Sequence, residues 1–180
     1  ENNYMIKPVN SYVQIQKIKE HSQIKDELLA LIDKMPDGRI NDTQYESITK
    51  SDFYLPKQYI RHYADLFLKI IQPYNENTRN FYKADEFWIS RYWFQQYENS
   101  DYHNWHVHSH NLLSSVYYIE MENKNSTLFY DYVTKEEYSF ELEEGDLITF
   151  PSVIAHKSQS NLLNRKTIIS YNSNFNKINL

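Results

Sequence analysis

The feature that most constrains this chain is a change in the period of its apolar residues near residue 80. Before that point apolar side chains recur at helical spacing, over residues 18–35 and again over residues 56–71. Pro36-Asp37-Gly38 is a turn signal that predicts the end of the first helix, and Pro73 predicts the end of the second. Residues 4–15 alternate weakly, so we also expect a strand there.

After residue 80 the apolar period changes to two. Segments rich in aromatic and β-branched residues predict strands at 86–97, 112–119, 127–133, 138–142, 146–150 and 167–175. Strands at this spacing, with helices segregated at the start, predict an α+β, mainly β fold built as a sandwich or barrel. We expect a single domain over residues 1–180, with an N-terminal strand and supporting helices in 1–80 and the β core in 81–180.

Two residue counts exclude whole classes of protein. The chain has no Cys, which excludes disulfides, thiolate nucleophiles, Cys-ligated zinc and iron–sulfur clusters. Its only glycines are Gly38 and Gly145, so it contains no glycine-rich dinucleotide or phosphate loop and no G-x-S-x-G nucleophile elbow. The chemistry must therefore come from other side chains.

Charge and hydropathy narrow the partners. The net charge of −5 gives no basic footprint, so nucleic acid is not an expected partner. No apolar run approaches the ~18 residues of a membrane span, and the first residues show no signal-peptide pattern. We therefore expect a cytoplasmic protein that acts on a small molecule or peptide, and the sequence leaves its oligomeric state open.

Histidines gather between residues 103 and 110. On an extended strand residues two apart face the same side, so His106 and His108 can converge on one point. Imidazole is the commonest metal ligand near neutral pH, although an isolated H-x-H is as typical of a surface loop. His156, which follows a predicted strand and turn, adds a third donor. His21 and His62 stand apart in the helical region, where exposed helix faces account for them.

An arginine completes the constellation. Arg165 stands nine residues after His156 and leads into the otherwise uncharged alternating strand that follows. The fork geometry of a guanidinium suits a carboxylate, which a buried anionic ligand could supply. A surface Arg just before a strand is the simpler interpretation of Arg165 when it is taken alone.

Together these residues resemble the Fe(II)- and 2-oxoglutarate-dependent dioxygenase superfamily, nearest to its prolyl-hydroxylase-like branch and to small oxygenases of bacteria and phages. The matching pieces are His106-Val107-His108, the segments 113–119 and 145–151, His156 and Arg165. The similarity runs over residues 86–174. It implies a double-stranded β-helix (a cupin-like jelly roll) with N-terminal supporting helices, so that residues 81–180 form the catalytic core.

The resemblance assigns iron ligands. His106 takes the place of the first ligand and His156 that of the distal histidine. His108 stands where the superfamily has Asp or Glu, which removes one negative charge from the usual 2-His-1-carboxylate set. That change is expected to raise the reduction potential and to weaken Fe(II) affinity. His103, His110 or Asp101 remain alternatives for one ligand.

The resemblance also assigns a cosubstrate site. Arg165 matches the base that grips the distal carboxylate of 2-oxoglutarate, and Tyr118 matches a strand hydroxyl that shares it. Thr167, Ile169 and Tyr171 follow Arg165 at steps of two, so we expect them to line the same interior face.

The implied activity is hydroxylation of an unactivated C–H bond in an amino acid, a prolyl peptide or a small metabolite. Its implied cofactors are Fe(II), 2-oxoglutarate as cosubstrate, and ascorbate. Two alternatives remain: a three-His cupin-like metal dioxygenase that does not use 2-oxoglutarate, and a non-catalytic jelly-roll binding module. Aromatic residues form either the floor of the substrate mouth or ordinary core: Tyr92, Trp93, Tyr97 and Trp105.

Overall fold

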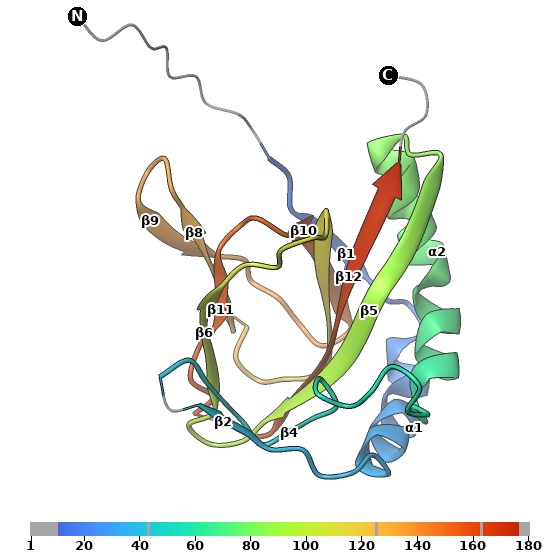
Figure 1. The fold of residues 1–180 in the computed structure, drawn as a ribbon, viewed down its shortest axis with the longest axis vertical. Coiled ribbons are helices and arrows are strands. Elements are labelled where there is room, and N and C mark those ends of the chain that lie inside the picture. The colour runs from blue at the N-terminus through green and yellow to red at the C-terminus, as the bar shows by residue number, and fades with distance from the viewer. Residues whose placement is uncertain (1–10, 43, 125, 163, 177–180) are drawn as a thin grey trace, which may run out of the picture.

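The computed structural model describes residues 11–176 except 43, 125 and 163, and over these residues a pair of antiparallel sheets face each other (Figure 1). The major sheet has, in spatial order, β1 (Gln14–Lys17), β10 (Asp146–Pro151), β7 (Leu113–Glu120), β12 (Lys166–Asn176), β5 (Glu86–Tyr97) and β4 (Lys50–Ser51). The minor sheet has β2 (Ile40–Asp42), β3 (Glu46–Ile48), β6 (Tyr102–His106), β11 (His156–Ser158), β8 (Thr127–Asp131) and β9 (Glu136–Ser139). This arrangement confirms the predicted mainly β fold, a jelly roll with few helices.

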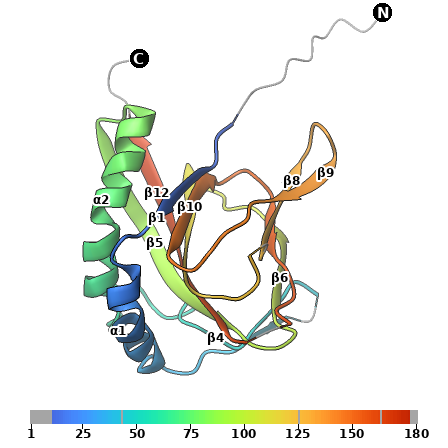
Figure 2. The ribbon, with the colours of Figure 1, turned by 180° about the vertical axis from the view of Figure 1, so that it is seen from behind.

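Helices α1 (His21–Asp33) and α2 (Ala64–Tyr82) cover the outer face of the major sheet (Figure 2). The apolar stripe predicted the first helix well. The second begins later than Pro56 and continues through Pro73, contrary to expectation. Pro73 is exposed, and the carbonyl that its missing N–H leaves unpaired belongs to the exposed Lys69, where water can reach it. Neither helix has the length and apolar content that crossing a bilayer demands.

Alternating side chains of the major sheet build two cores. On β7, Tyr117 and Ile119 pack against the helices, whereas Val116 and Tyr118 point into the space between the sheets. Strand β7 is therefore buried on both faces, so its sequence shows a run of consecutive buried residues rather than a strict alternation. The inner core fills one region of the space between the sheets, and the candidate site occupies another.

The N-terminal segment contributes more strands than the sequence predicts. The short strands β2, β3 and β4 lie between α1 and α2 in the sequence. Strands β2 and β3 extend the minor sheet, and β4 extends the major sheet. Strands of two or three residues are too short to show a period. Strand β1 overlaps the end of the strand expected over 4–15, and residues 4–10 lie outside the described residues.

His21 is buried rather than exposed, which corrects the expectation for this residue. Its side chain is 9% exposed, and its Nδ1 lies 2.7 Å from the Tyr117 hydroxyl. Gly145 packs against the ring with a φ of 86°, and a Cβ at that position would meet His21 Cγ at 2.9 Å. A glycine is required there both for the positive φ and for the close approach.

Candidate metal centre

Three histidines on or just beyond strands of the minor sheet meet at one point. His106 ends β6 and His156 begins β11, and the two residues are direct partners in the antiparallel register. His108 follows two residues after the end of β6. Each of the three rings offers one nitrogen, and these nitrogens lie within 4.8 Å of one another. The structure thus brings together the three residues that the sequence singled out.

Backbone carbonyls orient two of these rings. His106 Nδ1 lies 2.7 Å from the carbonyl oxygen of Asn104, and His156 Nδ1 lies 2.9 Å from that of Ile154. A carbonyl only accepts, so in each neutral ring Nδ1 carries the hydrogen and Nε2 keeps its lone pair. Such hydrogen bonds fix the tautomer of metal-binding histidines in general.

Burial keeps the trio uncharged. Desolvation lowers the pKa of His106, and it lowers the pKa of His108 to about 4. Burial also holds the pKa of His156 well below its usual value, with the neighbouring imidazoles acting in the same direction. Neutral imidazole is the form that coordinates a metal, so no proton has to be displaced near neutral pH.

The three rings line a cavity between the two sheets. The opposite wall comes from the inner faces of β5 and β12, and it includes Trp93, Gln95, Tyr97, Ser170 and Asn172. The Trp93 ring stacks on the His108 ring with centroids 5.8 Å apart. The cavity thus lies between a wall that carries imidazoles and a wall of aromatic and polar side chains.

The alternative ligands have other partners. His103 stacks on His106 with ring centroids 3.7 Å apart, and its Nε2 lies 3.3 Å from a Glu46 carboxylate oxygen. It lines the cavity but stands outside the trio. His110 is exposed with a φ of 66°. Asp101 is buried and accepts hydrogen bonds from the hydroxyls of Ser47 and Thr49, so its carboxylate is already satisfied.

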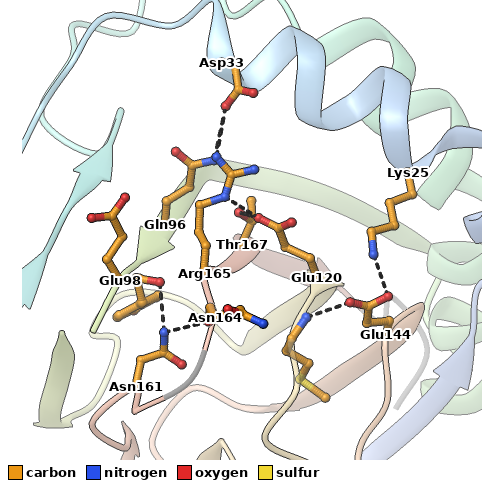
Figure 3. A network of polar contacts seen from close by, with 12 residues as sticks. Lys25, Asp33, Gln96, Glu98, Glu120, Glu144, Asn161, Asn164, Arg165 and Thr167 are labelled. Carbon is orange, nitrogen blue, oxygen red and sulfur yellow. Dashed lines mark hydrogen bonds and ion pairs between the residues drawn. The ribbon is translucent and has the colours of Figure 1, made fainter. Parts of the chain in front are cut away.

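Arg165 and Thr167 meet at the carboxylate of Glu120 (Figure 3), and neither is among the residues that line this cavity. Arg165 Nε donates to a Glu120 carboxylate oxygen at 2.6 Å, and the Thr167 hydroxyl donates to the same oxygen at 2.6 Å. A second carboxylate, of Asp33 at the end of α1, lies 3.5 Å from the guanidinium. The guanidinium is already paired, and neither residue lines the cavity, so the structure does not place them beside the histidines.

The parity of β12 is the reverse of the one we expected. Ile168, Ser170 and Asn172 line the cavity, whereas Ile169 packs into the core beneath the helices. Tyr171 belongs to that core and also borders the cavity. A shift in the β12–β7 register lies between Thr167 and Ile168. Because both faces of this strand are buried, its sequence does not reveal which face is the inner one.

Lys166 is a residue that the sequence analysis missed. Its side chain is 3% exposed, and Nζ donates to the Ser158 hydroxyl and lies 4.1 Å from the centre of the Tyr97 ring. Both contact residues line the cavity. Burial lowers the Lys166 pKa to about 7, and no carboxylate pairs with it among the described residues. The sequence does offer a signal for this residue. Lys166 follows Arg165 directly, and adjacent residues on a strand face opposite sides, so one of these two basic residues was bound to face the space between the sheets.

Tyr118 lies behind the cavity wall. It is 1% exposed, and its hydroxyl shares a hydrogen bond of 2.6 Å with Thr127, which lines the cavity. Among the four aromatic residues considered for a substrate mouth, Trp93 and Tyr97 line the cavity. Tyr92 packs against Tyr63 in the helical core, and Trp105 contacts Tyr130. The segment therefore supplies both cavity wall and core.

Solved structures share this architecture. A 2OG-Fe(II) oxygenase family oxidoreductase from Burkholderia pseudomallei aligns with a TM-score of 0.73 at 10% identity, over 93% of this chain and 88% of that chain. A Pseudomonas putida prolyl-4-hydroxylase aligns with a TM-score of 0.63 at 12% identity, over 90% and 92%. This chain has the fold of the 2-oxoglutarate- and Fe(II)-dependent oxygenases. The resemblance inferred from the histidines is confirmed at that level.

The oxygenase fold also carries other reactions. The α-ketoglutarate-dependent epimerase SnoN from nogalamycin biosynthesis aligns with a TM-score of 0.69 at 10% identity, over 89% of this chain and 76% of that chain. No family model matches the sequence, and no curated protein matches it. At these identities the likeness is one of fold, so activity has to be argued from the site.

Proposed function

We propose that this chain is an Fe(II)- and 2-oxoglutarate-dependent oxygenase that hydroxylates a C–H bond of an amino acid, a prolyl peptide or a small metabolite. The observation that carries the proposal is the meeting of three neutral histidines, with nitrogens within 4.8 Å, in a cavity whose wall residues Ser158 and Tyr97 contact the buried Lys166 ammonium behind them. The donor set fits a divalent first-row metal, since imidazole suits iron as well as zinc, copper and nickel.

His106, His108 and His156 would hold the metal. The Nε2 atoms of His106 and His156 are free because their Nδ1 atoms face carbonyls. Iron bound with 2-oxoglutarate supplies the oxidising chemistry, and the protein supplies geometry, positioning and exclusion of water. A neutral ring at position 108 leaves the site one negative charge short of a 2-His-1-carboxylate set, so weaker Fe(II) affinity is expected.

Lys166, rather than Arg165, is the anchor that we propose for the distal carboxylate of 2-oxoglutarate. A buried ammonium without a carboxylate is costly, and an anionic ligand would offset that cost. The Ser158 hydroxyl and the Tyr97 ring already fix the position of Nζ. Thr127, with Tyr118 behind it, provides a hydroxyl on the same cavity wall. Arg165 does not need an anionic ligand, because the Glu120 carboxylate already neutralises its guanidinium.

The test is anaerobic reconstitution. Fe(II) and 2-oxoglutarate added together are expected to give a weak metal-to-ligand charge-transfer absorption band, and admission of oxygen is expected to give succinate. Ascorbate is included in one arm, because it is an expected cofactor. Metal binding with neither the band nor succinate would overturn the proposal.

One observation favours a second candidate, a three-His cupin-like dioxygenase that does not use 2-oxoglutarate. Within the described residues the metal-binding group consists of histidines alone, with no carboxylate. If the protein consumed oxygen with a substrate at a rate that did not depend on 2-oxoglutarate, that result would favour this candidate. A protein purified without chelator that holds no stoichiometric metal would instead indicate a non-catalytic binding module.

A further inference from the structure

The third histidine is held differently from the other two. His108 Nδ1 lies 3.2 Å from Nδ2 of Asn172, a side-chain amide on β12. His106 and His156 face backbone carbonyls, which can only accept a hydrogen bond. An amide side chain offers a donor on one atom and an acceptor on the other, so it can present either to the ring.

The choice decides whether His108 can bind a metal through Nε2. If the amide nitrogen of Asn172 donates to Nδ1, the single hydrogen of the neutral ring resides on Nε2 and blocks coordination there. If the amide oxygen faces Nδ1, it accepts the Nδ1 hydrogen and leaves the Nε2 lone pair free. The two amide orientations have the same shape, because oxygen and nitrogen are nearly identical in size.

The far side of the amide can satisfy either orientation. The other polar atom of the Asn172 amide lies 3.0 Å from the Ser114 hydroxyl, which in turn lies 2.9 Å from the Ser152 hydroxyl. Hydroxyls both donate and accept. The series of hydrogen bonds then returns to His108, whose backbone N–H donates to the Ser152 carbonyl at 3.0 Å. Asn172, Ser114 and Ser152 are all buried, so water does not compete for these bonds.

We propose that Asn172 is a positioning residue that sets the tautomer of His108, with its amide oxygen toward Nδ1, so that Nε2 becomes the third metal ligand. A carboxylate at position 108 has no tautomer and would need no such partner. The need for a partner such as Asn172 therefore arises from the histidine at position 108. The inference rests on the metal site of the proposed function and is independent of the cosubstrate.

The first experiment determines the tautomer in metal-free protein at neutral pH. Long-range ¹H–¹⁵N correlation spectra of histidine-labelled protein are expected to show the Nδ1–H form for His108 in the wild type. Asn172→Asp, whose carboxylate only accepts, is expected to retain that form, and Asn172→Ala is expected to lose it. A wild-type His108 that carries its hydrogen on Nε2 would overturn the proposal.

The second experiment measures Mn(II) affinity by calorimetry. Asn172→Ala is expected to weaken binding about 10- to 100-fold, and Asn172→Asp is expected to retain wild-type affinity or better. Asn174→Ala is the matched control, because Asn174 lies two residues along β12 and accepts from the Leu112 backbone N–H at 2.9 Å. We expect it to leave the affinity unchanged.

A double-mutant cycle separates tautomer control from general packing. In a His108→Asp background Asn172→Ala is expected to change Mn(II) affinity by less than about threefold, because an aspartate ligand has no tautomer to set. An equal loss in both backgrounds, or an Asn172→Asp variant as weak as Asn172→Ala, would refute the role. A wild type that binds no metal would refute the proposed function, whereas the tautomer spectra would still decide this inference.

Discussion

The two sheets contribute to the candidate site in different ways. The minor sheet supplies His106 and His156 on short strands, and His108 follows two residues after β6. Backbone carbonyls of the same segments orient His106 and His156. The major sheet supplies no candidate ligand among the described residues, but its long strand β12 carries Lys166 and Asn172 toward the cavity. Helices back the major sheet alone (Figure 2). The helix-backed sheet thus carries the residues proposed to position ligands, whereas the histidines that would coordinate a metal lie on or beside the minor sheet.

This division predicts that the two cores can be weakened separately. Phe67 and Phe129 are both fully buried, the first under the helices and the second between the sheets. We expect either Phe→Ala substitution to lower the free energy of unfolding by about 3–5 kcal/mol in urea denaturation. Only Phe129→Ala is expected to lower Mn(II) affinity as well, because its ring lies 6.3 Å from the His156 ring. An equal loss of metal affinity in Phe67→Ala would contradict the division.

Adjacent residues on β12 and just before it provide a sharper contrast. Lys166→Met is expected to weaken 2-oxoglutarate binding to the Mn(II)-loaded protein about 100-fold, because it removes the buried cation. The same change is expected to raise the free energy of unfolding by about 2 kcal/mol, since a buried ammonium without a carboxylate is costly. Arg165→Met is expected to leave 2-oxoglutarate affinity within about threefold and to destabilise the fold, because it leaves Glu120 without its cation. The reverse result would return the anchor role to Arg165.

The same lysine predicts a pH dependence. Its pKa is lowered from 10.5 to about 7, so in ligand-free protein the ammonium loses its proton as pH rises above that value. The carboxylate requires the charged form, and 2-oxoglutarate affinity is therefore expected to be highest below pH 7 and to fall up to about tenfold per pH unit above it. Titrations between pH 6 and 9 measure this trend. An affinity that is flat over this range would exclude Lys166 as the anchor.

The smallest effect is expected at the fourth histidine of the cavity. His103 stacks on His106 without joining the trio. His103→Phe preserves a flat ring against His106, so we expect Mn(II) affinity to change by less than about threefold. A loss as large as that caused by His106→Ala would place His103 among the ligands of the minor sheet.

The sequence predicted the fold class because its periods are long and regular. The apolar stripe of α1 and the aromatic and β-branched content of β5 are strong local signals. The strands β2 to β4 were missed because they are too short to show a period, and their pairing with β5 and β6 is a tertiary effect. Pro73 gave a wrong prediction of a helix end. It lies on the exposed face of α2, where a proline is tolerated more easily than on the buried face.

The candidate ligands were predictable and the anchor was not. His106 and His108 stand in a recognisable motif, and a pair at that spacing needs only one more donor, which His156 provides. The anchor depends on which face of β12 points inward, and a shift of one residue exchanges Arg165 for Lys166. Asn172 carries no sequence signal, because its role depends on a contact with His108 across 64 residues of chain.

The register of β6 and β11 has a consequence for how a metal would enter. Since His106 and His156 are direct partners in the antiparallel ladder, this pair is assembled as soon as β6 and β11 pair. His108 lies beyond the strand and relies on contacts to the opposite sheet. Pairing of the two strands therefore fixes two of the three nitrogens that would hold a metal, whereas the place of the third depends on Asn172 and Trp93 of the opposite sheet.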